Sequence, residues 1–338
     1  MGRDAGLLQR QQHGTGIAMS GVLEQGLTWR GWRWVVREGK TLPTFPHAVF
    51  LAGVAALMWP TAEAPPWRVL TLITLIDAGV LAAGLTARRP EIRVAAGDVG
   101  VVLFVLLLAW HGVTAWAGLV DPLLIPAPEV ILALFVAELP DMTAGLWGSL
   151  ARLGLGVGLA LVTAIPLGLI VGWNRRLFRA VHPFTKVLGT IPPVVYIPYA
   201  IHFLPSFKLA AILVVFVGAF WPLFINTLRG VAHIPGPVID AARVLTLRPV
   251  PLLLRVILPA TLPSICTGAT LALCFSFLML TAAEVIGGSS GIGWYVNNFA
   301  DFADYHRVIV GILFIALVVS VVTWGTERLE RRLLRWHR

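Results

Sequence analysis

Charged side chains are scarce in this chain: Asp, Glu, Lys and Arg make up 13% of its 338 residues, against about 25% in an average soluble protein. Apolar residues make up 57%, and the mean hydropathy is +0.83. This composition excludes a soluble globular fold and indicates an integral membrane protein. Cysteine is also rare. Cys266 and Cys274 share one apolar segment, which argues against a disulfide framework and a cysteine metal site.

Motifs for catalysis are absent as well. The sequence has no GxxxxGK[ST] phosphate-binding loop, so we do not expect the chain to bind ATP itself. The Gly-rich segment GGSSGIG (287–293) lacks the lysine of such a loop and is interpreted as a turn. The eight histidines form no HxxxH or HExxH pair. We therefore expect no directly bound cofactor, no metal and no enzymatic activity of the chain's own.

The net charge of +9 does not form a nucleic-acid-binding patch, because the basic residues lie in short segments between apolar runs. Seven of these runs approach the roughly 20 residues that a membrane-spanning helix needs, and an eighth, 45–60, is shorter. The longer runs are 68–87, 99–119, 147–172, 187–204, 209–228, 263–286 and 307–325.

The distribution of Lys and Arg predicts the orientation. With eight spans, 22 of the 26 basic residues fall on one side. The positive-inside rule then places both termini in the cytoplasm. Seven spans would place the basic amino terminus outside, so eight are favoured.

Two segments outside the longer runs have a distinct composition. Residues 1–44 form a basic arm in which Trp and Arg interleave between Trp29 and Arg37. This mixture suits the lipid headgroup region, so we expect a membrane-adhering tail, with partner binding as the alternative. Residues 120–146 carry four acids and no Lys or Arg, as expected on the outer side. Within them, EVILALFVAEL (129–139) predicts a short surface helix.

Two carboxylates lie within the predicted spans, where ionisable groups are candidate functional residues. Asp77 is expected either to hydrogen-bond across a helix interface or to relay protons. Glu284, beside the Gly-rich turn, would line a solute pathway or cap a re-entrant bend. Arg152 is expected to form a salt bridge, snorkel to the surface or meet an anion. The glycines that surround it in 147–172 predict close packing against a neighbouring helix.

The polar, proline-marked segment 231–262 predicts a docking element between two apolar runs. Its first part, 238–247, predicts a helix too short to span. Val238, Ala241, Ala242 and Leu245 recur at helical spacing and predict one apolar stripe. A second short run, LLLRVILP (252–259), leads back to the membrane. The pattern fits a helix that transmits force from a soluble partner, or a plain surface helix.

This segment resembles the EAA motif of ABC importer permeases, EAA-x3-G-x9-I-x-L-P, with the spacing kept in full. Asp240 stands at the Glu of the motif, and Thr246 stands at its Gly. Because a β-branched residue resists the turn that Gly permits, the predicted bend moves to Arg248–Pro249. The residues that the resemblance assigns to ATPase coupling are Asp240, Ala241, Ala242, Arg243, Thr246, Val256, Leu258 and Pro259.

From about residue 97 onward, the chain is similar to the permeases of nitrate, sulfonate and taurine importers. The similarity is carried by IPAPEV (125–130), IPLGLIVGWNRRLFRAVHPF (165–184), TIPPVVYIPYA (190–200), GAFWPLFINTLRGV (218–231), AEVIGGSSGIGWYV (283–296) and RLERRLLRW (328–336). It implies an all-α membrane protein with a six-helix type I ABC importer permease core at 97–338. Residues 45–96 would add two amino-terminal transmembrane helices.

The resemblance implies a half-transporter in a bacterial inner membrane. Two copies, as a homodimer, would form the pathway, and a separate cytoplasmic ABC ATPase would use the ATP. An extracytoplasmic solute-binding protein would deliver a small solute of the nitrate, alkanesulfonate or taurine type. Three alternatives stay open: a proton-coupled secondary transporter that uses Asp77, a membrane-embedded enzyme, and a structural subunit paired with an active permease.

Overall fold

The computed structural model describes residues 44–57, 67–86, 90–244 and 248–334, and all regular structure in these ranges is helical. The basic arm up to residue 43 and the motif position Thr246 lie outside the described residues. The chain divides into two compact units, Met1–Gly112 and Val113–Arg338.

The first unit contains α3 (Thr44–Leu57), α4 (Trp67–Thr86) and α5 (Pro90–His111), which pack against one another. Helix α5 begins earlier than the predicted run 99–119, because Pro90 suits the first turn of a helix. It groups with α3 and α4 rather than with the second unit. The domain boundary at 96/97 stays a prediction.

Asp77 of α4 is buried in this unit and lies 2.7 Å from His47 Nδ1 of α3. The expected hydrogen bond across a helix interface is therefore present. The partner was not evident from the sequence, because His47 lies 30 positions away on another helix.

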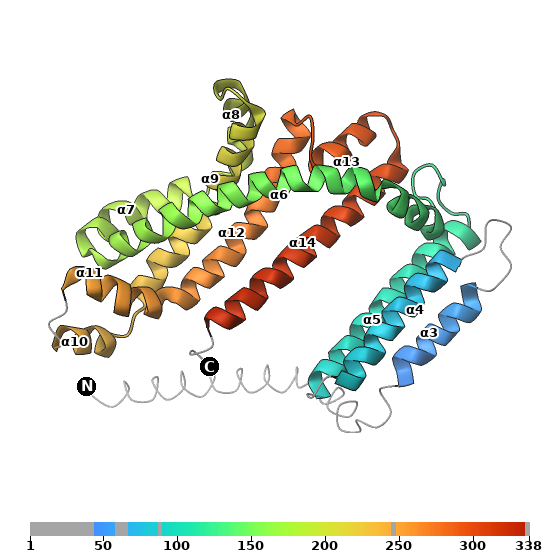
Figure 1. The fold of residues 1–338 in the computed structure, drawn as a ribbon, viewed down its shortest axis with the longest axis horizontal. Helices are drawn as coiled ribbons and strands as arrows, with labels where there is room; N and C mark the ends of the chain where they lie inside the picture. Colours follow the sequence, from blue (N-terminus) through green and yellow to red (C-terminus); the bar gives the residue numbers. More distant parts are fainter. Residues whose placement is uncertain (1–43, 58–66, 87–89, 245–247, 335–338) are drawn as a thin grey trace, which may run out of the picture. The chain divides into compact units, whose positions relative to one another are not determined.

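The second unit is built around long helices joined by short ones. In chain order these are π-helical turn η1 (Gly112–Trp116), α6 (Pro128–Trp173), α7 (Arg175–Leu188), 3₁₀ turn η2 (Pro193–Tyr196), α8 (Ile197–Phe203), α9 (Phe207–Ala232), α10 (Gly236–Val244), α11 (Pro249–Leu252), π-helical turn η3 (Leu253–Ile257), α12 (Leu258–Gly287), α13 (Ile292–Asp301) and α14 (Tyr305–Leu333). In Figure 1, α6 crosses α9 and α12, while α10 and α11 lie at one end of the unit and α8 and α13 at the other.

Helix α6 joins two elements that the sequence separated. The predicted surface helix 129–139 and the predicted span 147–172 form one 46-residue helix. Pro140 removes one backbone hydrogen bond without ending the helix, since the residues after it continue the helical pattern. At about 1.5 Å per residue, α6 is roughly 69 Å long, about twice the hydrocarbon thickness of a bilayer. The helix is therefore longer than a single upright span needs.

The predicted span 187–204 is not one helix. It contains the end of α7, a break, the η2 turn and the seven-residue α8. Gly189 and the prolines at 192, 193 and 198 explain the break, because Pro lacks the amide hydrogen that an uninterrupted helix needs. The run 252–259 continues directly into α12, in agreement with its predicted return to the membrane.

Five helical stretches of the described residues are long and apolar enough to cross a membrane. They are Val94–Trp116, Pro128–Trp173, Phe207–Ala232, Pro249–Gly287 and Tyr305–Leu333. The chain is thus a multi-pass membrane protein.

Helix α9 forms the centre of the second unit, packed against α6 and against α12. The approach of α6 is close because glycines face α9. A methyl group at Gly168 would lie 2.8 Å from Thr227 Cβ, and one at Gly156 would lie 2.8 Å from Val215 Cβ. Small residues allow such contact between helices in lipid, so the predicted packing role is confirmed for Gly156 and Gly168. At Gly154 and Gly158 nothing lies within 4 Å of an added methyl group, so the contact does not extend to them.

This contact predicts different effects on protein stability for two Gly→Ala substitutions in α6. Gly168→Ala is expected to destabilise the protein by about 1–3 kcal/mol, because α6 and α9 must separate. Gly154→Ala is the matched control, since nothing lies within 4 Å of its added methyl group. It is expected to be neutral or to stabilise by about 0.5–1 kcal/mol through helix propensity. Thermal unfolding in detergent measures both, and an equal effect of the two would contradict the packing.

Candidate functional site

Glu284 lies in the last turn of α12 and is almost completely buried, with 1% of its surface exposed. A carboxylate in such a position needs compensating donors, because an isolated buried charge is strongly unfavourable. The structure supplies them from α6 and from the start of α13.

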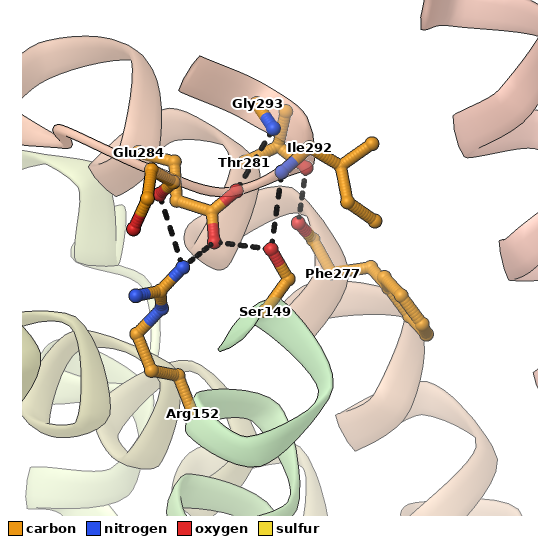
Figure 2. Close-up of polar contacts among 8 residues, drawn as sticks. Ser149, Arg152, Phe277, Thr281, Glu284, Ile292 and Gly293 are labelled. Carbon is orange, nitrogen blue, oxygen red and sulfur yellow. Dashed lines mark hydrogen bonds and ion pairs between the residues drawn. The ribbon is translucent and has the colours of Figure 1, made fainter. Parts of the chain in front are cut away.

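Figure 2 shows the resulting network. The Arg152 guanidinium donates to Glu284 Oε1 at 2.7 Å, and the Ser149 hydroxyl donates to the same oxygen at 2.6 Å. The backbone amide of Gly293 donates to Glu284 Oε2 at 2.8 Å. The carboxylate therefore joins α6, α12 and α13.

Further bonds attach the turn between α12 and α13 to the same groups. Arg152 Nη2 also donates to the Ser290 carbonyl at 3.1 Å, and the amide of Ile292 donates to Ser149 Oγ at 3.1 Å. The guanidinium also lies over the ring of Phe207, the first residue of α9, with Cζ 5.6 Å from the ring centroid.

Gly291 allows the turn to approach the carboxylate. Its φ of +124° is a conformation that L side chains rarely adopt, and an added Cβ would collide with the carboxylate of Glu284. The Gly-rich segment therefore turns beside Glu284, with the amides of the first turn of α13 directed at the acid and at Ser149. This geometry agrees with the bend-capping alternative for Glu284. The pathway alternative stays a prediction.

A second polar cluster ties the start of α6 to α13 and α14. Arg307 donates to Glu138 at 2.8 Å and to Asp304 at 2.8 Å, and the Tyr295 hydroxyl donates to Glu138 at 2.9 Å. Burial raises the pKa of the Tyr295 phenol, and its hydrogen bond to Glu138 raises it further, so the phenol remains a donor at neutral pH. Arg307 is 38% exposed, in contrast to the enclosed Arg152.

The other end of the second unit contains the predicted docking segment. Ala242 of α10 is buried, with 4% of its surface exposed, in a cluster with Leu169, Val231, Leu252 and Ile257. The motif residues Val256 and Leu258 are partly buried against the same cluster. Both halves of the motif therefore meet in one apolar contact, which gives a physical reason for the spacing between them.

The remaining motif residues whose side chains are described, and Val244 at the end of α10, lie outside this buried cluster. Asp240 and Ala241 are exposed, Val244 at the end of α10 is 83% exposed, and Pro259 is partly buried in the first turn of α12. The side chain of Arg243 lies outside the described residues. The ATPase-coupling role of all these positions stays a prediction.

The predicted apolar stripe of α10 is not buried as one face. Val238 is 40% exposed and Ala241 is exposed, while Ala242 alone of the described stripe is buried. Leu245 lies outside the described residues. A two-turn helix contacts its support over a small area, and Ala242 is short enough to allow that contact.

Sequence reasoning identified Glu284 and Arg152 separately and did not pair them. It missed Ser149 and the amides of Ile292 and Gly293. One signal was available: Ser149 and Arg152 are three residues apart and therefore share a helix face. Few cations lie in the apolar runs, so a buried carboxylate had few possible partners.

The network predicts a large cost for removing one charge. Glu284→Gln leaves Arg152 buried without its counterion. The substitution is expected to lower the free energy of unfolding by about 3–5 kcal/mol. Glu138→Gln, the matched control, is expected to cost about 1 kcal/mol or less, because its partner Arg307 is partly solvated. Adding Arg152→Met to Glu284→Gln should recover part of the loss. Thermal unfolding measures all three, and a harmless Glu284→Gln would contradict the buried pair.

Comparison with known proteins identifies the family. A family model described as "Binding-protein-dependent transport system inner membrane component" matches residues 164–335. The taurine transport system permease protein TauC of Escherichia coli is 31% identical over 270 residues, which are 78% of this chain and 98% of that protein. The putative aliphatic sulfonates transport permease protein SsuC of Bacillus subtilis is 30% identical over 241 residues, 70% of this chain and 87% of that protein.

A third relative matches over a shorter range. The nitrate import permease protein NrtB of Leptolyngbya laminosa is 37% identical over 170 residues, and the match spans 50% of this chain and 61% of that protein.

A solved structure confirms the predicted fold class. A chain of the MetNI methionine ABC transporter, in an inward-facing conformation, superposes with a TM-score of 0.52 at 19% identity. The match covers 58% of this chain and 98% of that chain, and it shows the type I ABC permease fold. The family consists of permease subunits, which are not enzymes, and the ATPase is a separate subunit. This chain belongs to the family of binding-protein-dependent transport system inner membrane components, the permease subunits of ABC importers.

Proposed function

We propose that two copies of this chain form the translocation pathway of an ATP-driven importer in a bacterial inner membrane, with both termini in the cytoplasm. A separate ABC ATPase docks on α10, and an extracytoplasmic solute-binding protein delivers the solute. The chain itself holds no cofactor in this arrangement.

The observation that carries this proposal is that α10 is packed against the spans on one side and exposed on the other. Ala242 fixes the helix to α6, α9 and the start of α12 through the buried cluster with Leu169, Val231 and Ile257. The exposed Asp240, Ala241 and Val244 leave another surface of the helix accessible. A helix that is attached on one side and open on the other can pass a displacement from a docked subunit to three spans.

The names of the relatives support the solute class. They specify nitrate, aliphatic sulfonates and taurine, and a further relative at 34% identity over 188 residues is named for bicarbonate transport. All four compounds carry a compact anionic oxygen group. We therefore propose a small oxyanion or sulfonate as the solute, recognised first by the binding protein.

The docking role predicts that Val244→Asp weakens copurification of the ATPase at least about tenfold. A carboxylate buried in a partner's groove without a counterion costs more than the roughly 1.4 kcal/mol that a tenfold change requires. Quantitative mass spectrometry of the complex, pulled down gently through the tagged permease, measures the ratio of ATPase to permease.

Leu123→Asp provides the matched control. Leu123 is 71% exposed and lies in the loop before α6, within the segment 120–146 that is predicted to be on the outer side, so the same change there should leave the ratio unaltered. Equal ratios for wild type and Val244→Asp would contradict docking at α10. Ala242 is unsuitable for this test, because its substitution would first disrupt the buried cluster.

Importer function predicts that proton exchange at Asp77 is not required. Asp77→Asn keeps the size of the side chain and can still hydrogen-bond to His47. The rate of ATP-dependent uptake into proteoliposomes should therefore stay within about twofold of wild type, which is a change in activation free energy of well under 1 kcal/mol. The control is uptake without ATP, which should be absent in both proteins. Uptake that is lost in Asp77→Asn and driven by a pH gradient alone would instead support the proton-coupled alternative.

A further inference from the structure

Helix α7 presents three different faces. It has 14 residues, RRLFRAVHPFTKVL, and follows α6 directly (Figure 1). Arg175, Arg179 and Lys186 recur at i, i+4 and i+11 and share one face, with Arg176 at its edge. Leu177, Phe184 and Leu188 recur at i, i+7 and i+11 on a second face.

The basic face has no counterions within the described chain. All four cations are exposed, none forms an ion pair with a described residue, and the helix itself contains no Asp or Glu. Three of the four lie in the first five residues. Cations are unfavourable there, because the positive end of the helix dipole repels them. The charges therefore oppose local helix stability, and an external anion would offset this cost.

The opposite face of the helix is apolar and is also uncovered. Phe184 is 65% exposed, Leu188 is 41% exposed and Leu177 is 39% exposed, and Val187, between the two faces, is 65% exposed. An apolar strip on the face opposite a basic strip is typical of a helix at the boundary between acyl chains and headgroups.

The third face and the start of the helix are fixed. Thr185 is buried, and Phe178 packs against the main apolar cluster of α6, α9 and α12 and stacks on His182. The Asn174 side chain accepts hydrogen bonds from the amides of Arg176 and Leu177 and so caps the helix. The orientation of the basic and apolar faces is therefore set by packing.

We propose that α7 is a binding surface for anionic phospholipids. The phosphate-bearing headgroups contact Arg175, Arg176, Arg179 and Lys186, and the acyl chains cover Leu177, Phe184 and Leu188. Charge complementarity selects this occupant over a zwitterionic lipid, and the apolar strip selects a lipid over a free phosphate. The inference does not depend on which solute is carried.

Native mass spectrometry of the full-length protein in mild detergent tests the proposal. Phosphatidylglycerol and phosphatidylcholine with identical acyl chains are added in equal amounts, and retention of the two lipids is compared. Wild type is expected to retain phosphatidylglycerol preferentially. The triple variant Arg175→Gln/Arg176→Gln/Arg179→Gln should lower this preference at least about tenfold, since each cation contributes about fivefold at an anionic surface.

Three controls separate α7 from general charge and from misfolding. The variant Arg175→Lys/Arg176→Lys/Arg179→Lys keeps the charge and should keep the preference. The variant Arg328→Gln/Arg331→Gln/Arg332→Gln removes three charges from α14 and should have a smaller effect. The single variant Arg179→Gln should show about a fivefold decrease if the triple variant does not fold.

Four outcomes would overturn the proposal. They are an unchanged preference in the α7 triple variant, an equal loss in the α14 variant, displacement of the lipid by glycerol phosphate at equal concentration, and loss of the ATPase or of the second copy with lipid retention intact. The last would mean that α7 is a protein contact.

Discussion

The second unit depends on the close packing of α9 between α6 and α12. In lipid, helices gain little from the hydrophobic effect when they associate, so close contact has to supply the stabilisation. Gly156 and Gly168 permit that contact on the α6 side. On the α12 side, the backbone at Gly268 approaches α9 closely, since an added Cβ would lie 2.8 Å from Asn226 Cβ. Bulkier residues at these positions would separate the three helices.

The packed helices α6, α9 and α12 connect the Glu284 network with the Ala242 cluster. Near one end, Arg152 of α6, Phe207 of α9 and Glu284 of α12 lie in or against the buried ionic network. At the other end, Leu169, Val231 and Ile257, from α6, α9 and the turn before α12, enclose Ala242 of α10. Each of the three helices thus runs from the proposed ATPase contact to the fixed turn at Gly291. A displacement of α10 would reach that turn through packed helices, without a flexible linker.

The sequence predicted the fold class and most of the long spans, because apolar length is a strong signal. It was wrong about continuity. Pro140 does not end α6, whereas Gly189 and the prolines after it do break the run 187–204. These opposite outcomes depend on neighbouring backbone bonds and packing, which residue identity alone does not specify. The EAA spacing predicted a docking segment, but only the structure shows that Ala242 faces inward. The pairing of Glu284 with Arg152 is a tertiary contact across 132 positions, and no local pattern encodes it.

The most direct test of coupling is the distance between the two α10 helices of the proposed two-copy transporter. Cys266 and Cys274 are the free cysteines of the described chain and can be replaced by Ser, leaving one spin label at Val238→Cys in each copy. Val238 lies in the first turn of α10, is 40% exposed and is on a different face of the helix from Val244, so the label stays clear of the proposed ATPase contact. Double electron–electron resonance would then report one distance across the pair, with and without ATP bound to the ATPase. A shorter distance with ATP is predicted, because closure of the ATPase pair draws the docking helices together. An unchanged distance, or no distance between copies, would contradict the account.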